Sequence, residues 1–310
     1  MSSLKQAAKI SSPSVISRDP SSTAPAVEEC WTTIDGSRMR YLRAGSGPPL
    51  LLVHGLMGYS FSWRFAIPVL AQYATVCAPD LLGAGFSDRP TDLDVTLRAQ
   101  ADRLLQFVDQ MGWTSFDLLG TSHGGAVAMM LAAVSVERSD PRLHRLILVA
   151  PANPYSSRGR WLGHALGSRL GQFLFLNIAA RPASFQNMWV KRLFGDKRRI
   201  PDDALAGYRA PTQMPGLFES GLCIAKVWNQ EMEALRSVLP AIGRYPTLLI
   251  WGSEDGAVRT ESALPLARHF AHGKLVIMPG VGHLPYEEAQ TEFNQLVVEF
   301  LTGDRKASPV

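Results

Sequence analysis

Short apolar runs alternate with amphipathic segments along most of the chain, and this alternation predicts its secondary structure. The apolar runs end in turn residues, which is typical of strands that are buried on both faces of a sheet. The predicted strands are Trp31–Ile34, Met39–Arg43, Pro49–Val53, Ala74–Ala78, Phe116–Leu119, Leu146–Ala150, Thr247–Trp251 and Leu275–Met278.

Helical patterns separate most of these runs. In Leu97–Met111 the apolar residues recur at three- and four-residue spacing, and an Ala-rich segment that ends near Val136 follows a later strand. Further helices are predicted for Glu261–Phe270 and Glu287–Leu301, and Asp35-Gly36 is a good hairpin turn between the first two strands. Strands that alternate with helices in this way favour an α/β fold with a mostly parallel, doubly wound sheet.

The alternation stops between Asn153 and Leu239, where helical segments and loops occur without a strand pattern. We therefore expect a helical cap over residues 153–240, inserted into an α/β core made of residues 28–152 and 241–303. Residues 1–27 are rich in Ser, Ala and Pro and predict a disordered tail, with a transit peptide as the alternative.

Composition excludes several classes of protein. The 310 residues are 46% hydrophobic and 19% charged, as in a globular protein with a sizeable core, and the net charge of +4 gives no reason to expect a nucleic-acid partner. No apolar run approaches the roughly 18 residues of a membrane span, and there is no secretory signal, so a cytoplasmic location is expected. The sequence contains no P-loop and no Cys/His zinc pattern, so neither a metal nor an organic cofactor is expected.

The segment Gly-Thr-Ser-His-Gly at residues 120–124 joins a buried apolar run to a helix of small residues. This setting predicts a nucleophile elbow with Ser122 as the nucleophile. A sharp turn would lift the hydroxyl above the sheet, and the flanking glycines would let neighbouring backbones approach closely. The positive end of the following helix would face the position where an oxyanion forms.

A serine nucleophile needs a base, and the base needs an orienting acid. Asp255 follows one predicted strand and His283 follows the next, so both are expected at the carboxyl edge of the sheet. Glu254 is the alternative acid, and Asp80 is expected to cap its own loop. The other histidines are expected in packing, surface or hydrogen-bonding roles: His54, His144, His164, His269 and His272.

An oxyanion hole is predicted from two backbone N–H groups. One belongs to His123, the residue after the nucleophile, and the other to Leu56 in the loop His-Gly-Leu-Met-Gly. The N–H of Met57 is a close alternative to that of Leu56. Donors of this kind supply about 2.7–4 kcal/mol each to a transition state.

These motifs occur in an order that resembles the α/β-hydrolase superfamily, in its branch with a helical cap. The resemblance spans roughly residues 29–303 and rests on His54-Gly55, Asp80-Leu-Leu-Gly-Ala-Gly-Phe-Ser-Asp, Gly-Thr-Ser-His-Gly-Gly, Trp251-Gly-Ser-Glu-Asp and Gly282-His283. Epoxide hydrolases and haloalkane dehalogenases of this branch carry aspartate as the nucleophile, whereas this chain has serine. Proline iminopeptidases carry His-Gly-Gly-Pro-Gly where this chain has His-Gly-Leu-Met-Gly, so peptidase activity is not expected.

Together, the motifs and the resemblance predict a serine esterase that forms an acyl-enzyme and needs no cofactor. The expected partner is a small hydrophobic ester with a short-to-medium acyl group. A carbon–carbon bond hydrolase and a cofactor-free perhydrolase would use the same triad and are alternatives. A non-catalytic ligand receptor on a hydrolase fold is an alternative from a different class. The oligomeric state is not predicted.

The predicted cap has an unusual charge. Residues 153–200 contain nine basic residues and one acidic residue, Asp196. The favoured interpretation is an apolar helical face packed over the pocket, with the basic face in solvent. The alternative is a weak contact with a membrane surface through the basic cap. The apolar positions of this face are Trp161, Leu162, Leu166, Leu170, Phe173, Leu174 and Phe175.

Overall fold

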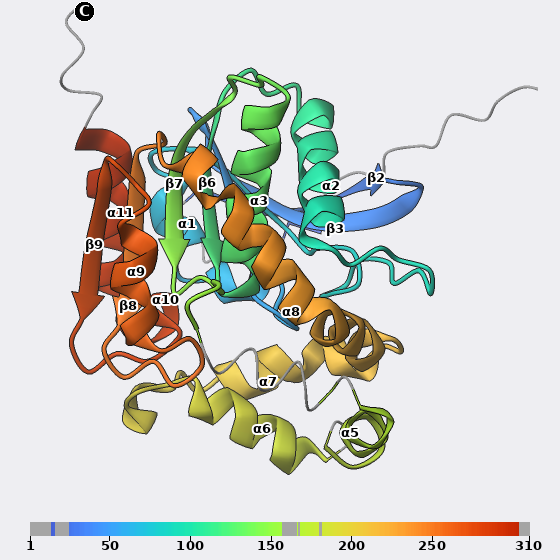
Figure 1. Ribbon diagram of the computed structural model, residues 1–310. Helices are drawn as coiled ribbons and strands as arrows, with labels where there is room; N and C mark the ends of the chain where they lie inside the picture. Colours follow the sequence, from blue (N-terminus) through green and yellow to red (C-terminus); the bar gives the residue numbers. More distant parts are fainter. Residues whose placement is uncertain (1–13, 16–24, 157–165, 167, 180–181, 304–310) are drawn as a thin grey trace, which may run out of the picture.

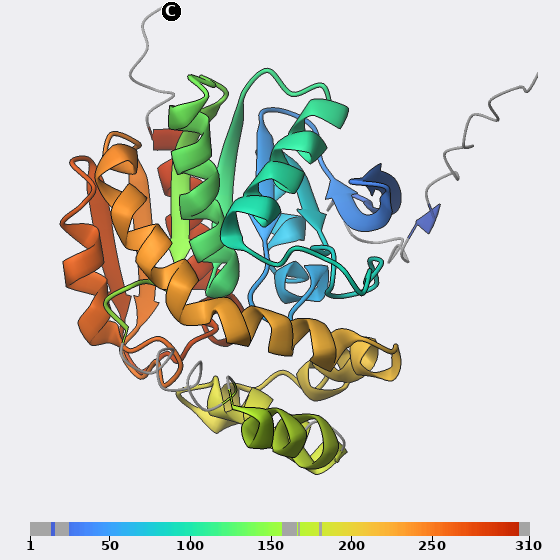
Figure 2. The ribbon, with the colours of Figure 1, turned by 45° about the vertical axis from the view of Figure 1, so that its right-hand side comes forward.

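A single nine-stranded sheet forms the centre of the computed structural model, which describes residues 14–15, 25–156, 166, 168–179 and 182–303. Helices cover both faces of the sheet (Figures 1 and 2). In sheet order, the strands are β1 (Ser14–Val15), β2 (Val27–Ile34), β3 (Ser37–Ala44), β5 (Thr75–Pro79), β4 (Pro49–Val53), β6 (Phe116–Thr121), β7 (Leu143–Val149), β8 (Thr247–Gly252) and β9 (Gly273–Met278). Pairing is antiparallel from β1 to β5 and parallel from β5 to β9. This is the predicted α/β-hydrolase sheet.

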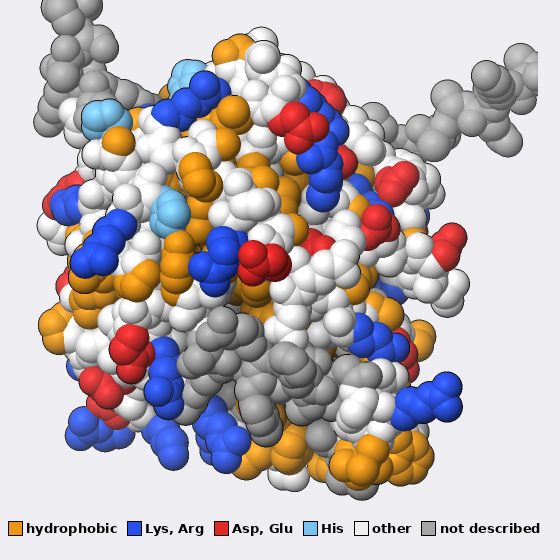
Figure 3. All heavy atoms as spheres, in the orientation of Figure 1, with side chains coloured by type: hydrophobic (Ala, Val, Ile, Leu, Met, Phe, Trp, Pro, Cys, Tyr) orange, Lys and Arg blue, Asp and Glu red, His pale blue; other side chains and the backbone are white. Residues whose placement is uncertain are grey.

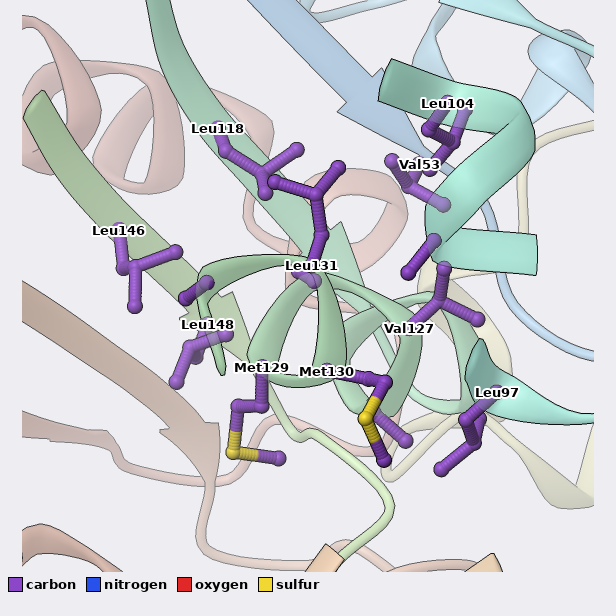
Figure 4. Packing of buried hydrophobic residues seen from close by; sticks show 14 of the residues in the cluster. Val53, Leu97, Leu104, Leu118, Val127, Met129, Met130, Leu131, Leu146 and Leu148 are labelled. Carbon is purple, nitrogen blue, oxygen red and sulfur yellow. The ribbon is translucent and has the colours of Figure 1, made fainter. Parts of the chain in front are cut away.

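Successive residues of the central strands divide the hydrophobic core between the two faces of the sheet. Leu51 and Val53 of β4 belong to the core shared with α2 (Leu97–Gln110), α3 (His123–Glu137) and α8 (Leu217–Ile242). Leu50 and Leu52 belong to the core shared with α1 (Ile67–Leu70) and α11 (Gln290–Gly303). A strand with helices on both faces must be apolar at every position, which explains the continuous runs. Figure 4 shows the first face, where α3 packs against β6 and β7.

The predicted strands and the hairpin are confirmed. Asp35 and Gly36 have φ values of 52° and 75°, the left-handed pair that a tight hairpin turn requires. One helix prediction was too long, and another missed a break. The segment from Glu261 contains only a 3₁₀ turn and α9 (Ala263–Ala267), and the last helix is split into α10 (Pro285–Glu288) and α11. The split occurs because Ala289 leaves the helical conformation, with φ −135° and ψ 56°.

After β7 the chain leaves the sheet and forms helices that cover the carboxyl ends of the parallel strands (Figures 1 and 2). Among the described residues between β7 and β8, helices and turns occur without any strand. They include α5 (Arg169–Leu174), a π-helical turn η2 (Phe175–Ala179), α6 (Ala183–Arg192), α7 (Ala204–Arg209) and α8. The second half of α8 packs against α3 in the core, so this one helix joins the cap to the sheet.

The predicted tail, residues 1–27, lies for the most part outside the described residues. Ser14 and Val15 pair with Glu29 and Glu28 of β2, and β2 begins at Val27. Across the segments that the structure describes, no helix combines the length and the apolar character needed to cross a membrane.

Candidate active site

Ser122 lies between the end of β6 and the start of α3 in a conformation that serine rarely adopts. Its φ is 52° and its ψ is −123°. Such a conformation costs of order 1–3 kcal/mol and persists only where the surrounding structure holds it in place. The Ser122 N–H donates to Val149 O at 3.0 Å, and Ser122 O accepts from Ala152 N at 2.8 Å. The Ser122 side chain does not cap α3, although serine at this position of a helix commonly does. Its hydroxyl is therefore available for chemistry.

Three glycines allow the neighbouring backbones to approach this turn. A Cβ at Gly120 would lie 2.4 Å from Gly124 O, and a Cβ at Gly124 would lie 2.2 Å from His54 O. A Cβ at Gly125 would lie 2.5 Å from the Cβ of Pro151. Any side chain at these positions would push the start of α3 away from the sheet. The sequence pattern of the elbow thus has a steric cause.

Asp255 and His283 are brought together by the adjacent parallel strands β8 and β9. His283 Nδ1 lies 2.7 Å from Asp255 Oδ2, and both side chains are buried. Asp255 Oδ1 accepts the N–H groups of Ala257 and Val258 at 2.8 and 2.9 Å. Because a carboxylate only accepts, the hydrogen bond places the proton on His283 Nδ1. His283 Nε2 is then left to accept a proton, as a general base must.

The alternative acid, Glu254, does not contact the histidine ring. Its side chain is exposed, and Glu254 Oε1 accepts a hydrogen bond from Ser253 Oγ at 3.1 Å. The two neighbouring carboxylates are therefore separated by the turn after β8, which points Asp255 inward and Glu254 outward.

Glu288 holds the loop that carries the histidine, and the sequence analysis did not identify it. Glu288 Oε2 accepts from Gly282 N and from Gly195 N, both at 2.9 Å, and Oε1 accepts from the next N–H of the cap at 2.8 Å. The backbone N–H of His283 donates a hydrogen bond to Leu193 O at 2.6 Å. Glu288 thus positions the histidine loop against the cap. No local pattern could have shown this, because Gly195 is 93 residues away in sequence.

The predicted oxyanion donors lie in a turn after β4 and at the start of α3. Gly58 N donates to Gly55 O at 3.0 Å, and Met57 has a φ of 56°, as the third residue of a type II turn requires. A Cβ at Gly55 would lie 3.1 Å from the Cβ of the serine, so this turn lies against the elbow. Within the described residues, the N–H groups of Leu56, Met57 and His123 donate to no other backbone group. All three are free to bind an oxyanion.

Asp80 organises the loop below the oxyanion turn. Its carboxylate accepts from Ser60 N at 2.7 Å and from Phe86 N at 2.9 Å, and it pairs with Arg40 at 3.1 Å. A Cβ at Gly85, where φ is 54°, would lie 2.4 Å from the Asp80 carboxylate. The predicted loop-capping role of Asp80 is confirmed.

His54 also has a structural role, as expected. Its Nδ1 donates to Gly55 O at 2.8 Å, and its Nε2 accepts from Leu81 N at 2.9 Å. Both ring nitrogens are therefore used by the backbone. Burial lowers the pKa of His54, although the nearby Asp80 carboxylate opposes this effect. The neutral ring joins the oxyanion turn to the loop after β5.

A cavity of about 20 Å³ lies beside the oxyanion turn, between α8 and the core. This is room for about one water molecule. Gln100 Oε1 is buried and has no hydrogen-bond partner among the described residues. The described part of the lining is mainly apolar and includes no Lys or Arg. It consists of His54, Gly55, Leu56, Met57, Leu81, Leu82, Gly83, Ala84, Gln100, His123, Leu217, Gly221 and Ile224.

Replacing His123 with Phe is expected to make the stability less sensitive to acid. Burial, with a smaller effect of the nearby His54, lowers the pKa of His123 from 6.5 to about 4. The folded state therefore binds this proton less readily than the unfolded chain. The stabilisation is complete above the unfolded pKa and is lost as the pH falls from 6.5 towards 4, by about 2 kcal/mol at about pH 5.

Urea unfolding at about pH 7 and about pH 5 would measure this difference. The wild type should lose about 2 kcal/mol more stability between these conditions than His123→Phe does. His272→Gln provides a control for the loss of a histidine at an exposed position. Equal losses in wild type and His123→Phe would show that the buried ring does not resist protonation.

Comparison with known proteins identifies the family. Residues 48–290 match the family model of the alpha/beta hydrolase fold. Haloalkane dehalogenase 2 of Mycobacterium tuberculosis (strain ATCC 25618 / H37Rv) is 30% identical over 286 residues, which cover 88% of this chain and 94% of that protein. The 2-hydroxymuconate semialdehyde hydrolase of Pseudomonas sp. (strain CF600) is 29% identical over 274 residues, which cover 86% of this chain and 91% of that protein.

A solved structure agrees with these sequence matches. The meta-cleavage product hydrolase CumD of Pseudomonas fluorescens IP01 superposes with a TM-score of 0.74 at 24% identity, over 88% of this chain and 97% of that structure. This likeness shows the fold. The family match covers most of the sequence, and it includes the elbow, the acid and the histidine. The chain therefore belongs to the α/β-hydrolase family, and it is a hydrolase of that family.

Proposed function

We propose that this hydrolase cleaves carboxylic esters through an acyl-enzyme on Ser122. His283 is the general base and acid, Asp255 orients it, and the N–H groups of Leu56 and His123 bind the oxyanion. The observation that carries the proposal is the strained Ser122 turn, whose hydroxyl caps no helix, together with the buried His283–Asp255 hydrogen bond of 2.7 Å. A strained serine and an oriented imidazole are the two parts that acyl transfer requires.

In the proposed mechanism, His283 Nε2 takes the hydroxyl proton while Ser122 Oγ attacks the ester carbonyl carbon. The carbonyl oxygen becomes an oxyanion and accepts hydrogen bonds from the N–H groups of Leu56 and His123. The protonated His283 then gives its proton to the leaving alcohol, and the acyl-enzyme remains. His283 then deprotonates a water molecule, whose oxygen attacks the acyl carbon. As the bond between that carbon and Ser122 Oγ breaks, the protonated His283 returns its proton to Oγ, which releases the acid and restores the serine.

The nucleophile argues against the reaction named for the dehalogenase relative. An alkyl-enzyme ester needs a carboxylate nucleophile, which the resemblance implies for dehalogenases, whereas this chain has Ser122 at the elbow. A serine would form an alkyl ether with a haloalkane, and water could not readily cleave it. Acyl transfer is the chemistry that a serine can complete.

Carbon–carbon bond hydrolysis is the second candidate, favoured by the 29% identity to 2-hydroxymuconate semialdehyde hydrolase. Ser122, activated by the same histidine and aspartate, could attack the ketone of such a substrate. Muconate derivatives carry a carboxylate, however, and among the described residues none that lines the cavity is a Lys or Arg. Desolvating an unpaired carboxylate is costly, so this described lining supports a neutral acyl group as the first candidate.

Steady-state hydrolysis of p-nitrophenyl esters from acetyl to dodecanoyl would test the proposal. We expect turnover with an optimum at a short-to-medium chain, because the residues beside the oxyanion turn are mainly apolar. Activity on acetate alone would contradict a hydrophobic acyl site. Faster turnover of a vinylogous 1,5-diketone than of any ester would replace the proposal with the carbon–carbon reaction.

A further inference from the structure

Four large apolar side chains on the cap helices α5 and α6 lie in solvent. Leu170, Phe173 and Leu174 are 68%, 59% and 43% exposed, and Trp189 is 48% exposed. In the rest of the described chain only three other large apolar side chains are comparably exposed, and these lie apart on separate segments: Tyr73, Leu264 and Ile277. The cap therefore carries most of the exposed apolar side chains of this kind.

The spacing of these residues gives α5 an apolar face, and that face is exposed. Leu170, Phe173 and Leu174 follow the i, i+3, i+4 pattern and share one helical face, which normally packs on a core. Here that face is exposed, and neither α5 nor α6 has a fully buried side chain among its described residues. The expectation that this face packs over the pocket is wrong for these three residues. Trp161 and Leu162 of the predicted face lie outside the described residues.

The segment that carries these apolar side chains is also basic. Figure 3 shows Lys and Arg side chains beside apolar ones at the cap end of the molecule. Among the described residues from Arg169 to Arg199, the only acid is Asp196, which pairs with Arg198 at 2.8 Å. Arg192 lies 5.6 Å over the Trp189 ring, so this cation borders the apolar side chains directly. The basic residues of this surface are Arg169, Lys191, Arg192, Lys197, Arg198 and Arg199.

This combination matches the chemistry of an anionic lipid surface. Helices that lie in a bilayer interface expose Leu, Phe and Trp toward the acyl region and Lys or Arg toward the phosphates. Each Lys or Arg near an anionic leaflet adds attraction that salt screens. A protein partner would have to be acidic and shaped to fit two separate helices, whereas a bilayer needs only the matching charge and an apolar layer.

We propose that α5 and α6 dock the cap onto the surface of an anionic phospholipid bilayer. The docking residues are Leu170, Phe173, Leu174 and Trp189, and the basic side chains of the same segment bind the lipid phosphates. Phe175, which follows α5, packs on Phe218 at a ring distance of 6.2 Å. Phe218 is next to Leu217, which lines the cavity. The turn that follows α5 therefore contacts the neighbour of a residue that lines the cavity beside the oxyanion turn.

The docking extends the proposed function to esters that partition into membranes. That part of the inference rests on the proposed function, whereas bilayer binding does not. The test therefore uses Ser122→Ala, which removes the nucleophile and leaves both cap helices unchanged. It measures binding alone, so its outcome is independent of whether esters are hydrolysed.

Co-sedimentation with vesicles would measure the docking. Ser122→Ala should sediment with vesicles that contain about one third phosphatidylglycerol and not with pure phosphatidylcholine, and about 0.5 M NaCl should weaken the binding. Leu170→Ser combined with Phe173→Ser should weaken binding at least about tenfold. Leu264→Ser is the matched apolar control, because Leu264 is 55% exposed on α9, outside the cap.

A second pair of variants tests whether the basic side chains contribute to binding. It also provides a separate test if the serine variants do not fold. Lys191→Glu combined with Arg192→Glu should abolish binding to the anionic vesicles, whereas Arg268→Glu, at the end of α9, should not.

Equal binding to neutral and anionic vesicles, or wild-type binding by the cap variants, would overturn the proposal. A dimer in light scattering that Leu170→Ser disrupts, with no vesicle binding, would also overturn it and assign the surface to a second copy of the chain. Vesicle binding without ester hydrolysis would retain the docking and reject only the proposed function.

Discussion

Replacing Ser122 with Ala is expected to lower kcat for every hydrolysed ester by at least about 10⁴-fold. Without the Oγ no acyl-enzyme forms, and His283 has no hydroxyl to deprotonate. The free N–H groups beside the elbow remain and can still stabilise an oxyanion, so a small residual rate is expected. Alanine is no more strained than serine at a φ of 52°, so the fold should be unchanged.

Two measurements would separate loss of chemistry from loss of structure. A fluorophosphonate probe should label the wild type at the peptide that contains Ser122 and should not label Ser122→Ala. The melting temperatures of the two proteins should agree. Ser237→Ala, on the exposed side of α8, should keep full activity. If the Ser122→Ala protein retains more than about a tenth of the wild-type kcat, the assigned nucleophile is wrong.

Asp255→Asn is expected to reduce kcat by about 10⁴-fold, and the hydrogen bonds give the reason. Asp255 Oδ1 accepts two backbone N–H groups, from Ala257 and Val258. Only the oxygen of an asparagine could replace it there, so the amide NH₂ would face His283 Nδ1. An NH₂ group only donates, which forces the proton of the ring to Nε2. The imidazole would then present an N–H to Ser122 and could not act as its base.

Glu254→Gln is the matched control for this prediction. It changes the neighbouring carboxylate in the same way, but Glu254 contacts Ser253 in solvent and does not contact the ring. We expect kcat to change by less than about threefold. A larger loss in Glu254→Gln than in Asp255→Asn would mean that the other carboxylate orients the base. Alkaline pH should not rescue Asp255→Asn fully, because the defect is in the tautomer and not in the charge alone.

The sequence predicted the elements whose causes are local. A strand with helices on both faces must be apolar throughout, so β4 could be predicted residue by residue from Pro49 to Val53. The elbow could be predicted because Gly120 and Gly124 are needed for backbone contacts a few residues away or at the adjacent strand. The hairpin at Asp35-Gly36 depends only on two left-handed residues. The order of the motifs along the chain then indicated the superfamily.

Contacts between distant parts of the chain could not be predicted in this way. Glu288 resembles any surface glutamate of a helix, and its role depends on Gly195 and Gly282 being brought to the same place by the cap and by β9. Asp255 and Glu254 are adjacent after the same strand, and the turn after β8 decides which of the two side chains points inward.

The sequence by itself determined the α/β core, the elbow at Ser122 and the order of the acid and the histidine, because each has a periodic or steric cause within a short segment. Only the tertiary structure decided what covers each apolar face. Periodicity places Leu170, Phe173 and Leu174 on one side of a helix, but it does not say whether a core or solvent lies opposite. That depends on how the cap segments pack on each other and on the sheet, which no local pattern encodes.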